Sequence, residues 1–172
     1  GVLDWGPKLL KSSGGITLSH AAWMVAGFEV AGIIGMLVAG RVTDKVFGGR
    51  GPRTCAFCMG FCALFTCLFL LEWTSAKPNA LLSAALLAGA GFFIYGPQAL
   101  IGISAANIAT KKAAATASGL TGTFGYASGL VSGVFLGWLM DVGGDKGITY
   151  VLTALIVLAF LGMLTFVLVW PA

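Results

Sequence analysis

Charged residues are scarce in this chain, and their scarcity excludes a soluble domain. Only 9% of the 172 residues are charged and 58% are hydrophobic, and the mean hydropathy is +0.97. A soluble protein of this length keeps much more polar surface for contact with water. The sequence therefore predicts a protein whose solvent is lipid.

Histidine is almost absent, which limits the chemistry that the chain can perform. The single histidine, His20, precedes the triplet Ala127-Ser128-Gly129, so no later histidine is present to complete an intramembrane serine protease. No glycine-rich loop ends in the Gly-Lys-Ser/Thr pattern of a P-loop. The cysteines lie in one apolar helix with no histidine nearby, so we interpret them as packing residues rather than zinc ligands: Cys55, Cys58, Cys62 and Cys67. We expect no enzymatic activity, no metal site and no cofactor.

Long apolar stretches, in contrast, fill most of the sequence. A spanning helix needs about 20 mainly apolar residues, and five such stretches occur. They are Ala21 to Gly40, Thr54 to Glu72, Leu81 to Ala105, Ala113 to Met140 and Ile148 to Trp170. Residues 1–11 are too few to cross, and we interpret them as the end of a truncated sixth helix. The predicted fold class is an all-α, multi-pass membrane protein.

The basic residues predict the orientation of the spans. With alternate loops on one side, that side carries six cations and one anion, whereas the opposite side carries four of each. The first side holds Arg41, Lys45, Arg50, Arg53, Lys111, Lys112 and Asp44; the second holds Lys8, Lys11, Lys77, Lys146, Asp4, Glu72, Asp141 and Asp145. By the positive-inside rule the segment from Gly40 to Arg53 is cytoplasmic. The net charge of +4 thus reflects topology and requires no nucleic-acid partner.

Glycines recur along one predicted helix at intervals of three and four residues. They are Gly119, Gly122, Gly125, Gly129, Gly133 and Gly137, and a weaker form of the pattern occurs at Gly32, Gly35, Gly89, Gly91 and Gly96. Glycines at this spacing share one helix face and let a neighbouring backbone approach closely. We expect this stripe on the predicted helix from Ala113 to Met140 to serve helix packing.

Pro97 lies inside a predicted span, where it removes an intrahelical hydrogen bond and should bend the helix. In lipid such a bend is tolerated where protein or a water-filled cavity satisfies the freed carbonyl. Both a functional hinge and plain packing remain open. Tyr95 would place its hydroxyl beside this bend.

Glu29 is the most costly residue in the chain, because it lies near the middle of a span. An acidic residue there costs about 2.5–3.5 kcal/mol on insertion scales. An intramembrane carboxylate indicates a functional site, either facing a polar cavity or paired with a cation. No Lys or Arg lies within another complete span, so we expect the partner to come from missing sequence. The alternative is a buried carboxylate that locks two helices together.

The segment GRVTDKVFGGRGPR, from Gly40 to Arg53, resembles the signature of the major facilitator superfamily. That signature lies between the second and third helices of each six-helix half. Further segments narrow the resemblance: DWGPKLL, FEVAGIIG, FFIYGPQALIG and TKKAAATASGLTGTFGY are similar, in order, to the organophosphate:inorganic phosphate antiporters. The resemblance implies the C-terminal six-helix half of a major facilitator fold, with its first helix truncated and a missing N-terminal half as partner.

The resemblance also implies where substrate binds. Family members hold phosphate with an arginine on the first helix of each half, which here would stand just before Gly1. Glu29 matches a cavity glutamate, and Tyr95 and Tyr126 match tyrosines near the substrate. Ser118 and Thr121 replace the Asp and Lys that some hexose-phosphate transporters carry, which favours the glycerol-3-phosphate branch or the related sensor; substrate identity stays open.

The activity that the resemblance implies is exchange of an organophosphate for inorganic phosphate across the inner membrane, by alternating access. A phosphate monoester carries about −1.5 to −2 charges, so it needs fixed positive charge and hydroxyl donors to cross the hydrocarbon. One alternative is a membrane sensor that detects external sugar phosphate and signals to a partner kinase. Another is a purely structural or assembly subunit.

We do not expect the charged residues of the segment from Gly40 to Arg53 to bind substrate. We interpret Arg41, Asp44 and Lys45 as a cytoplasmic charge latch that favours one conformation, and Arg50 and Arg53 as orientation anchors. Substrate is expected near Glu29 rather than here.

Overall fold

The fold is all-helical in the part of the chain that the structure describes. The structure is a computed structural model and describes residues 18–75, 79–110 and 112–169. The helices are α2 (Leu18–Lys45), α3 (Gly51–Trp73), α4 (Ala80–Ile108), α5 (Ala114–Gly143) and α6 (Gly147–Leu168), with a 3-10 turn η1 (Gly144–Lys146). All five α-helices are long and apolar enough to cross a membrane. The predicted all-α class is confirmed, with five helices of membrane-spanning character.

Some of the predictions fall on residues outside the described ranges. These are the truncated helix over residues 1–11 with Asp4, Lys8 and Lys11, together with Lys77, Lys111 and Trp170. The assignment of the chain to a C-terminal half therefore stays a prediction.

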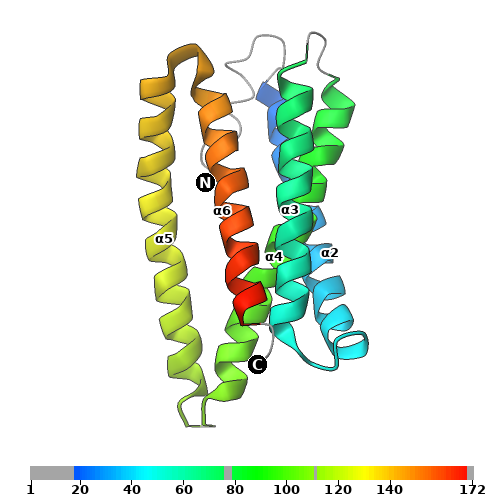
Figure 1. Ribbon diagram of the computed structural model, residues 1–172, viewed down its shortest axis with the longest axis vertical. Coiled ribbons are helices and arrows are strands. Elements are labelled where there is room, and N and C mark those ends of the chain that lie inside the picture. The colour runs from blue at the N-terminus through cyan, green and yellow to red at the C-terminus, as the bar shows by residue number, and fades with distance from the viewer. Residues whose placement is uncertain (1–17, 76–78, 111, 170–172) are drawn as a thin grey trace.

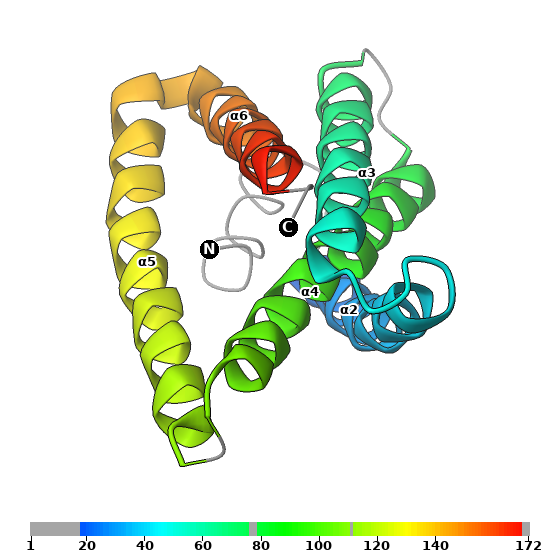
Figure 2. The same ribbon diagram turned by 60° about the horizontal axis from the view of Figure 1, so that its bottom comes forward.

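The helices form a packed group with one helix set apart from it (Figures 1 and 2). α4 packs against both α2 and α3, and α3 also packs against α6. Two small clusters form the interior of this group: Met24 with Phe69 and Leu152, and Ala39 with Cys55, Cys58 and Leu100. α5 contacts mainly α4 and α6, its neighbours in sequence, and only Leu136 of this helix is buried.

Glycine makes the contact between α2 and α4 unusually close. A Cβ atom added at Gly35 would overlap the backbone oxygen of Phe92, and one added at Gly91 would lie 2.5 Å from the backbone oxygen of Phe28. At Gly96 the neighbour is a side-chain atom instead, because an added Cβ would lie 2.9 Å from the Cβ of Ala39. Backbone atoms cannot move aside as side chains can, so this crossing requires residues without a side chain.

The glycine stripe of α5 is open at five of its six positions in the described part of the chain. A Cβ at Gly119, Gly122, Gly125, Gly129 or Gly133 would meet no atom within 4 Å in the described part of the chain. These five glycines therefore have no close partner among the described residues, and a packing role for the stripe stays a prediction. Close packing occurs instead at the glycines of α2 and α4, where the sequence pattern is weaker.

The link between α2 and α3 is shorter than the sequence suggests. α2 continues through Arg41, Asp44 and Lys45, and α3 already begins at Gly51, so only residues 46–50 lie outside a helix. Gly48 and Gly49 have φ angles of 59° and 81°, which glycine adopts without the strain that a Cβ causes. The charged residues thus extend both helices beyond their apolar parts, and two glycines make the turn.

The opposite turn, between α3 and α4, is fixed by two polar side chains. Asn79 caps α4 by accepting hydrogen bonds from the backbone N–H groups of Leu81 and Leu82, at 3.0 and 3.4 Å. Glu72 Oε1 accepts the N–H of Asn79 at 2.7 Å. α4 then continues through the buried Pro97 as one helix.

Candidate functional site

The site begins with a hydrogen bond between two helices. Tyr95 of α4 donates its hydroxyl to Glu29 Oε2 of α2 at 2.6 Å, and both side chains are partly buried. This is a short distance for a hydrogen bond between a hydroxyl donor and a carboxyl oxygen. The two residues are 66 positions apart in sequence, so the α2–α4 crossing alone brings them together.

The helix packing holds the tyrosine ring in place. Gly32 lies nearly one turn after Glu29, and a Cβ there would be 2.5 Å from the Tyr95 ring. The ring also meets Phe28 edge-on, with centroids 6.0 Å apart and planes at 68°. With glycine below it and phenylalanine beside it, the ring directs its hydroxyl toward the carboxylate.

The second carboxylate oxygen is in a different state. Glu29 Oε1 is buried and has no hydrogen-bond partner in the described part of the chain. A carboxylate accepts several hydrogen bonds, and a buried oxygen without one costs free energy. Tyr95 satisfies one oxygen with a neutral donor, and the expectation that a cationic partner comes from missing sequence stays a prediction. The other oxygen has an unfilled position for a donor.

The predicted substrate residues of α5 do not join this pair. Tyr126 is 83% exposed, and Ser118 is exposed as well. Thr121 donates its hydroxyl to the backbone oxygen of Ser118 at 2.8 Å, which uses its proton within the helix. The structure thus places Glu29 and Tyr95 together, whereas Tyr126, Ser118 and Thr121 form a separate set on α5.

The signature segment lies at the end of α2 and the start of α3. Arg41, Asp44, Lys45 and Arg50 are exposed, whereas Arg53 is partly buried in the first turn of α3. The positions of these side chains at the helix ends agree with a role outside the substrate site. The latch itself stays a prediction.

Two threonines beneath this segment were missed by the sequence interpretation. Thr43 donates its hydroxyl to Thr54 at 2.8 Å and also lies 2.8 Å from the backbone oxygen of Ala39. Both threonines are buried, at 5% and 2% exposure, and they tie the end of α2 to the start of α3. The signal available in the sequence is a pair of threonines at the two helix ends that the signature segment joins.

An apolar cavity lies close to the pair but is unsuited to phosphate. It has a volume of about 230 Å³ and lies between α2, α3, α4 and α6, with Phe28, Ala90 and Leu152 in its wall. Cys62 and Thr66 are its most polar lining residues, and none is charged. A phosphate there would lose its hydration without gaining a cation.

The cysteines lie in the packed interior of the bundle. Cys55, Cys58 and Cys62 are buried and Cys67 is partly buried, all as free thiols. Among the described residues, no group of three His, Cys, Asp or Glu side chains is placed to hold a metal ion.

These features define a class of protein before any comparison is made. Five spanning helices, a close glycine crossing and a half-satisfied carboxylate within the spans are typical of a polytopic membrane protein with a polar site in its helix bundle. Comparison with known families then identifies it: the Major Facilitator Superfamily matches residues 6–172. The chain belongs to this superfamily.

The relatives described here are two transport proteins and one membrane sensor by name. A probable hexose phosphate transport protein of Chlamydia pneumoniae is 40% identical over 173 residues, which cover 99% of this chain and 36% of that protein. The glycerol-3-phosphate transporter of Bacillus subtilis is 38% identical over 144 residues, or 82% of this chain and 31% of that protein. The membrane sensor protein UhpC of Salmonella typhimurium is 36% identical over 165 residues, which cover 92% of this chain and 36% of that protein.

The chain therefore spans about a third of the length of the curated relatives it matches. No solved structure gives a significant match.

Proposed function

We propose that the full-length protein carries an organophosphate, either glycerol-3-phosphate or a hexose phosphate, across the inner membrane in exchange for inorganic phosphate. The relatives support the substrate class, since two of those described above are transporters of such compounds by name. In this proposal the chain supplies the C-terminal half of an alternating-access carrier.

The observation that carries the proposal is the state of Glu29. One oxygen accepts from Tyr95, and the other is buried without a donor among the described residues. A structural lock would be expected to satisfy both oxygens, because each unfilled buried position costs free energy. An unfilled position suits a carboxylate that changes partners during a cycle.

The partner that fits this position is a cation that also binds phosphate. Arginine suits both, since its planar fork matches carboxylate and phosphate oxygens equally well. We infer that substrate phosphate and Glu29 compete for such an arginine, so that binding of substrate releases the carboxylate to Tyr95 alone. Each change of partner would accompany a movement between the two halves of the carrier.

Exchange in proteoliposomes tests this function. Full-length protein is reconstituted into vesicles loaded with labelled phosphate, and efflux is measured after glycerol-3-phosphate, a hexose phosphate or no substrate is added outside. We expect efflux only when an external organophosphate is present. Failure of every organophosphate to release label, from protein that folds and inserts, would contradict the proposal.

A sensor is the second candidate, favoured by the similarity to UhpC over 92% of the chain. Both functions need a site for sugar phosphate, so the Glu29–Tyr95 pair suits either. The same vesicles separate them: a sensor binds hexose phosphate with measurable affinity but releases no label.

A further inference from the structure

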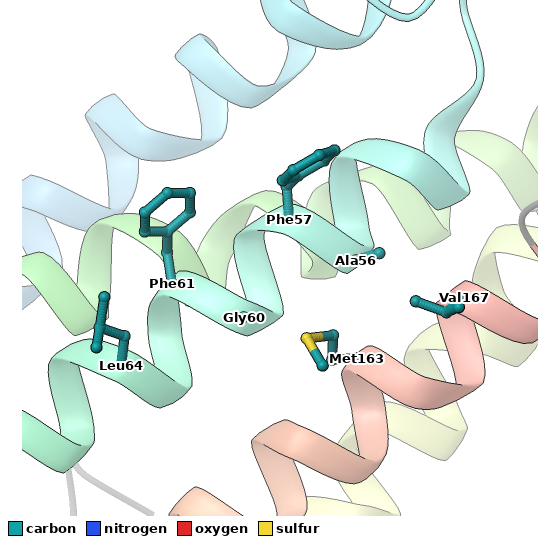
Figure 3. Close-up of a pocket in the computed structure, with 7 residues that line it drawn as sticks. All are labelled: Ala56, Phe57, Gly60, Phe61, Leu64, Met163 and Val167. Atoms are coloured by element: carbon teal, nitrogen blue, oxygen red, sulfur yellow. The ribbon is translucent and has the colours of Figure 1, made fainter.

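A groove runs along the outer side of the α3–α6 pair, away from the Glu29 site. It has a volume of about 270 Å³ and is lined by Ala56, Phe57, Gly60, Phe61, Leu64, Met163 and Val167. Figure 3 shows Met163 and Val167 of α6 facing the α3 backbone at Gly60, with Ala56 at the same end as Val167. All of these side chains are apolar, so the groove suits a hydrocarbon chain.

Two arginines stand where the apolar stripe of α3 begins. Arg53 precedes Ala56 by three residues and Phe57 by four, so it lies on nearly the same face of α3. Arg50 lies just before Gly51, the first residue of that helix. Arg50 is exposed and Arg53 is partly buried. The groove therefore has cations at one end and only apolar residues beyond.

The groove faces the surroundings of the bundle rather than its interior. Four of its residues keep about half of their surface exposed: Phe57 (51%), Phe61 (45%), Leu64 (50%) and Val167 (45%). α3 and α6 also have the highest hydropathy of the five spans. Helices of this kind are stable when lipid contacts them.

The length of the stripe matches a single leaflet. From Arg53 to Leu64 the helix rises by about 16 Å at 1.5 Å per residue, which is roughly half of the ~30 Å hydrocarbon core. The arginines lie in the segment whose charge predicts a cytoplasmic location, and anionic lipids are concentrated in that leaflet.

We propose that this groove binds an anionic phospholipid of the cytoplasmic leaflet, with one acyl chain along Ala56 to Leu64 and the phosphate at Arg50 and Arg53. The charge at one end selects the anionic headgroup, whereas the groove fixes the chain. A substrate site inside the bundle would not require cations and an apolar groove on its outer side. A soluble ligand would not require them there either.

Native mass spectrometry of the full-length protein in detergent tests this proposal. Phosphatidylglycerol and phosphatidylcholine with identical acyl chains are titrated separately, and the affinity of the first bound lipid is compared. We expect phosphatidylglycerol to bind more tightly. The double variant R50Q/R53Q should lose at least about tenfold of that affinity, since each cation near an anionic surface contributes roughly fivefold.

Two matched controls make the result specific. R41Q/K45Q removes the same charge from the end of α2, which lies off the stripe, and should change the affinity by less than twofold. Val167→Phe fills the groove and should weaken phosphatidylglycerol binding at least threefold, whereas Val157→Phe, at an equally exposed position of α6 outside the groove, should not.

Three results would overturn the proposal. Equal affinity for the two lipids would show that the groove does not select an anionic headgroup. Equal effects of R50Q/R53Q and R41Q/K45Q would show that the lipid is attracted by the general surface charge and not by Arg50 and Arg53. A change in oligomeric state by Val167→Phe, with lipid affinity intact, would make the groove a contact between copies of the protein.

Discussion

The α2–α4 crossing and the exposed face of α5 are both rich in glycine, yet the two regions differ in almost every other respect. At the crossing, Gly35 and Gly91 touch backbone atoms of the opposite helix. On α5, Gly119, Gly125 and Gly133 meet nothing within 4 Å in the described part of the chain. Regular glycine spacing thus gives a helix the capacity for close approach, but it does not identify the helix that approaches.

The same difference separates the two sets of predicted site residues. Tyr95 and Glu29 are held at the crossing by a hydrogen bond of 2.6 Å, whereas Tyr126 of α5 is 83% exposed. The first set is preorganised before any ligand arrives. The second can act only together with groups from outside the described residues.

The largest effect on stability is expected when one methyl group is added to each of the two regions. Gly35→Ala places a Cβ against the backbone oxygen of Phe92, and should destabilise by at least about 3 kcal/mol because the backbone cannot move aside. Heating followed by size-exclusion chromatography should show a midpoint lower by roughly 6–12 °C.

Gly125→Ala is the matched control on α5. No atom lies within 4 Å of the added methyl group, and alanine favours a helix over glycine by about 1 kcal/mol. The midpoint should stay the same or rise. A loss of stability equal to that of Gly35→Ala would show that α5 is as tightly packed as the crossing.

Removing the hydroxyl from each of the two tyrosines tests whether Tyr95 and Tyr126 have different roles. Tyr95→Phe leaves a second oxygen of Glu29 without its donor, and should cost about 1.5–3 kcal/mol of stability, the value of a hydrogen bond to a charged group. Tyr126→Phe should leave the unfolding midpoint unchanged and instead raise the KM for organophosphate in the vesicle assay. Equal losses of stability in both variants would contradict the different roles.

A smaller effect is expected at the buried threonine pair. Thr54→Val removes one of the two acceptors of the Thr43 hydroxyl, the other being the Ala39 backbone oxygen, and should cost about 0.5–1.5 kcal/mol. Thr153→Val is the control, because the Thr153 hydroxyl is exposed and donates only to Thr149 within α6. If both variants unfolded at the same temperature, the pair would not stabilise the joint between α2 and α3.

The smallest effect on stability is expected at the predicted latch. Asp44 is exposed at the end of α2, so Asp44→Asn should change the unfolding midpoint little, within about 0.5 kcal/mol. It should alter the rate of exchange more than the equilibrium affinity for substrate. Asp141→Asn, an exposed aspartate at the far end of α5, should alter neither, and a change confined to affinity in Asp44→Asn would place Asp44 in the binding site.

Much of the fold follows from the sequence, because lipid demands long apolar helices. The five spans and the expectation that Glu29 is a functional residue depend on local composition alone. The pairing of Glu29 with Tyr95 does not, since it depends on which helices cross and on the glycines that let them do so. The length of α2 was also underestimated, because charged residues beyond the hydrocarbon continue a helix as readily as apolar ones until Gly48 and Gly49 turn the chain.

The role of Glu29 is tested most directly by Glu29→Gln in the phosphate exchange assay. The amide oxygen still accepts from Tyr95, so this variant removes the negative charge and keeps the hydrogen bond. The control is Glu72→Gln, which changes the other glutamate of the chain in the α3–α4 turn. We predict that exchange by Glu29→Gln falls about 30-fold or more, as expected when a buried charge pair loses ~2 kcal/mol, while Glu72→Gln exchanges normally. Exchange by Glu29→Gln at the unmodified rate would contradict a transport role for this carboxylate and leave it as a lock between two helices.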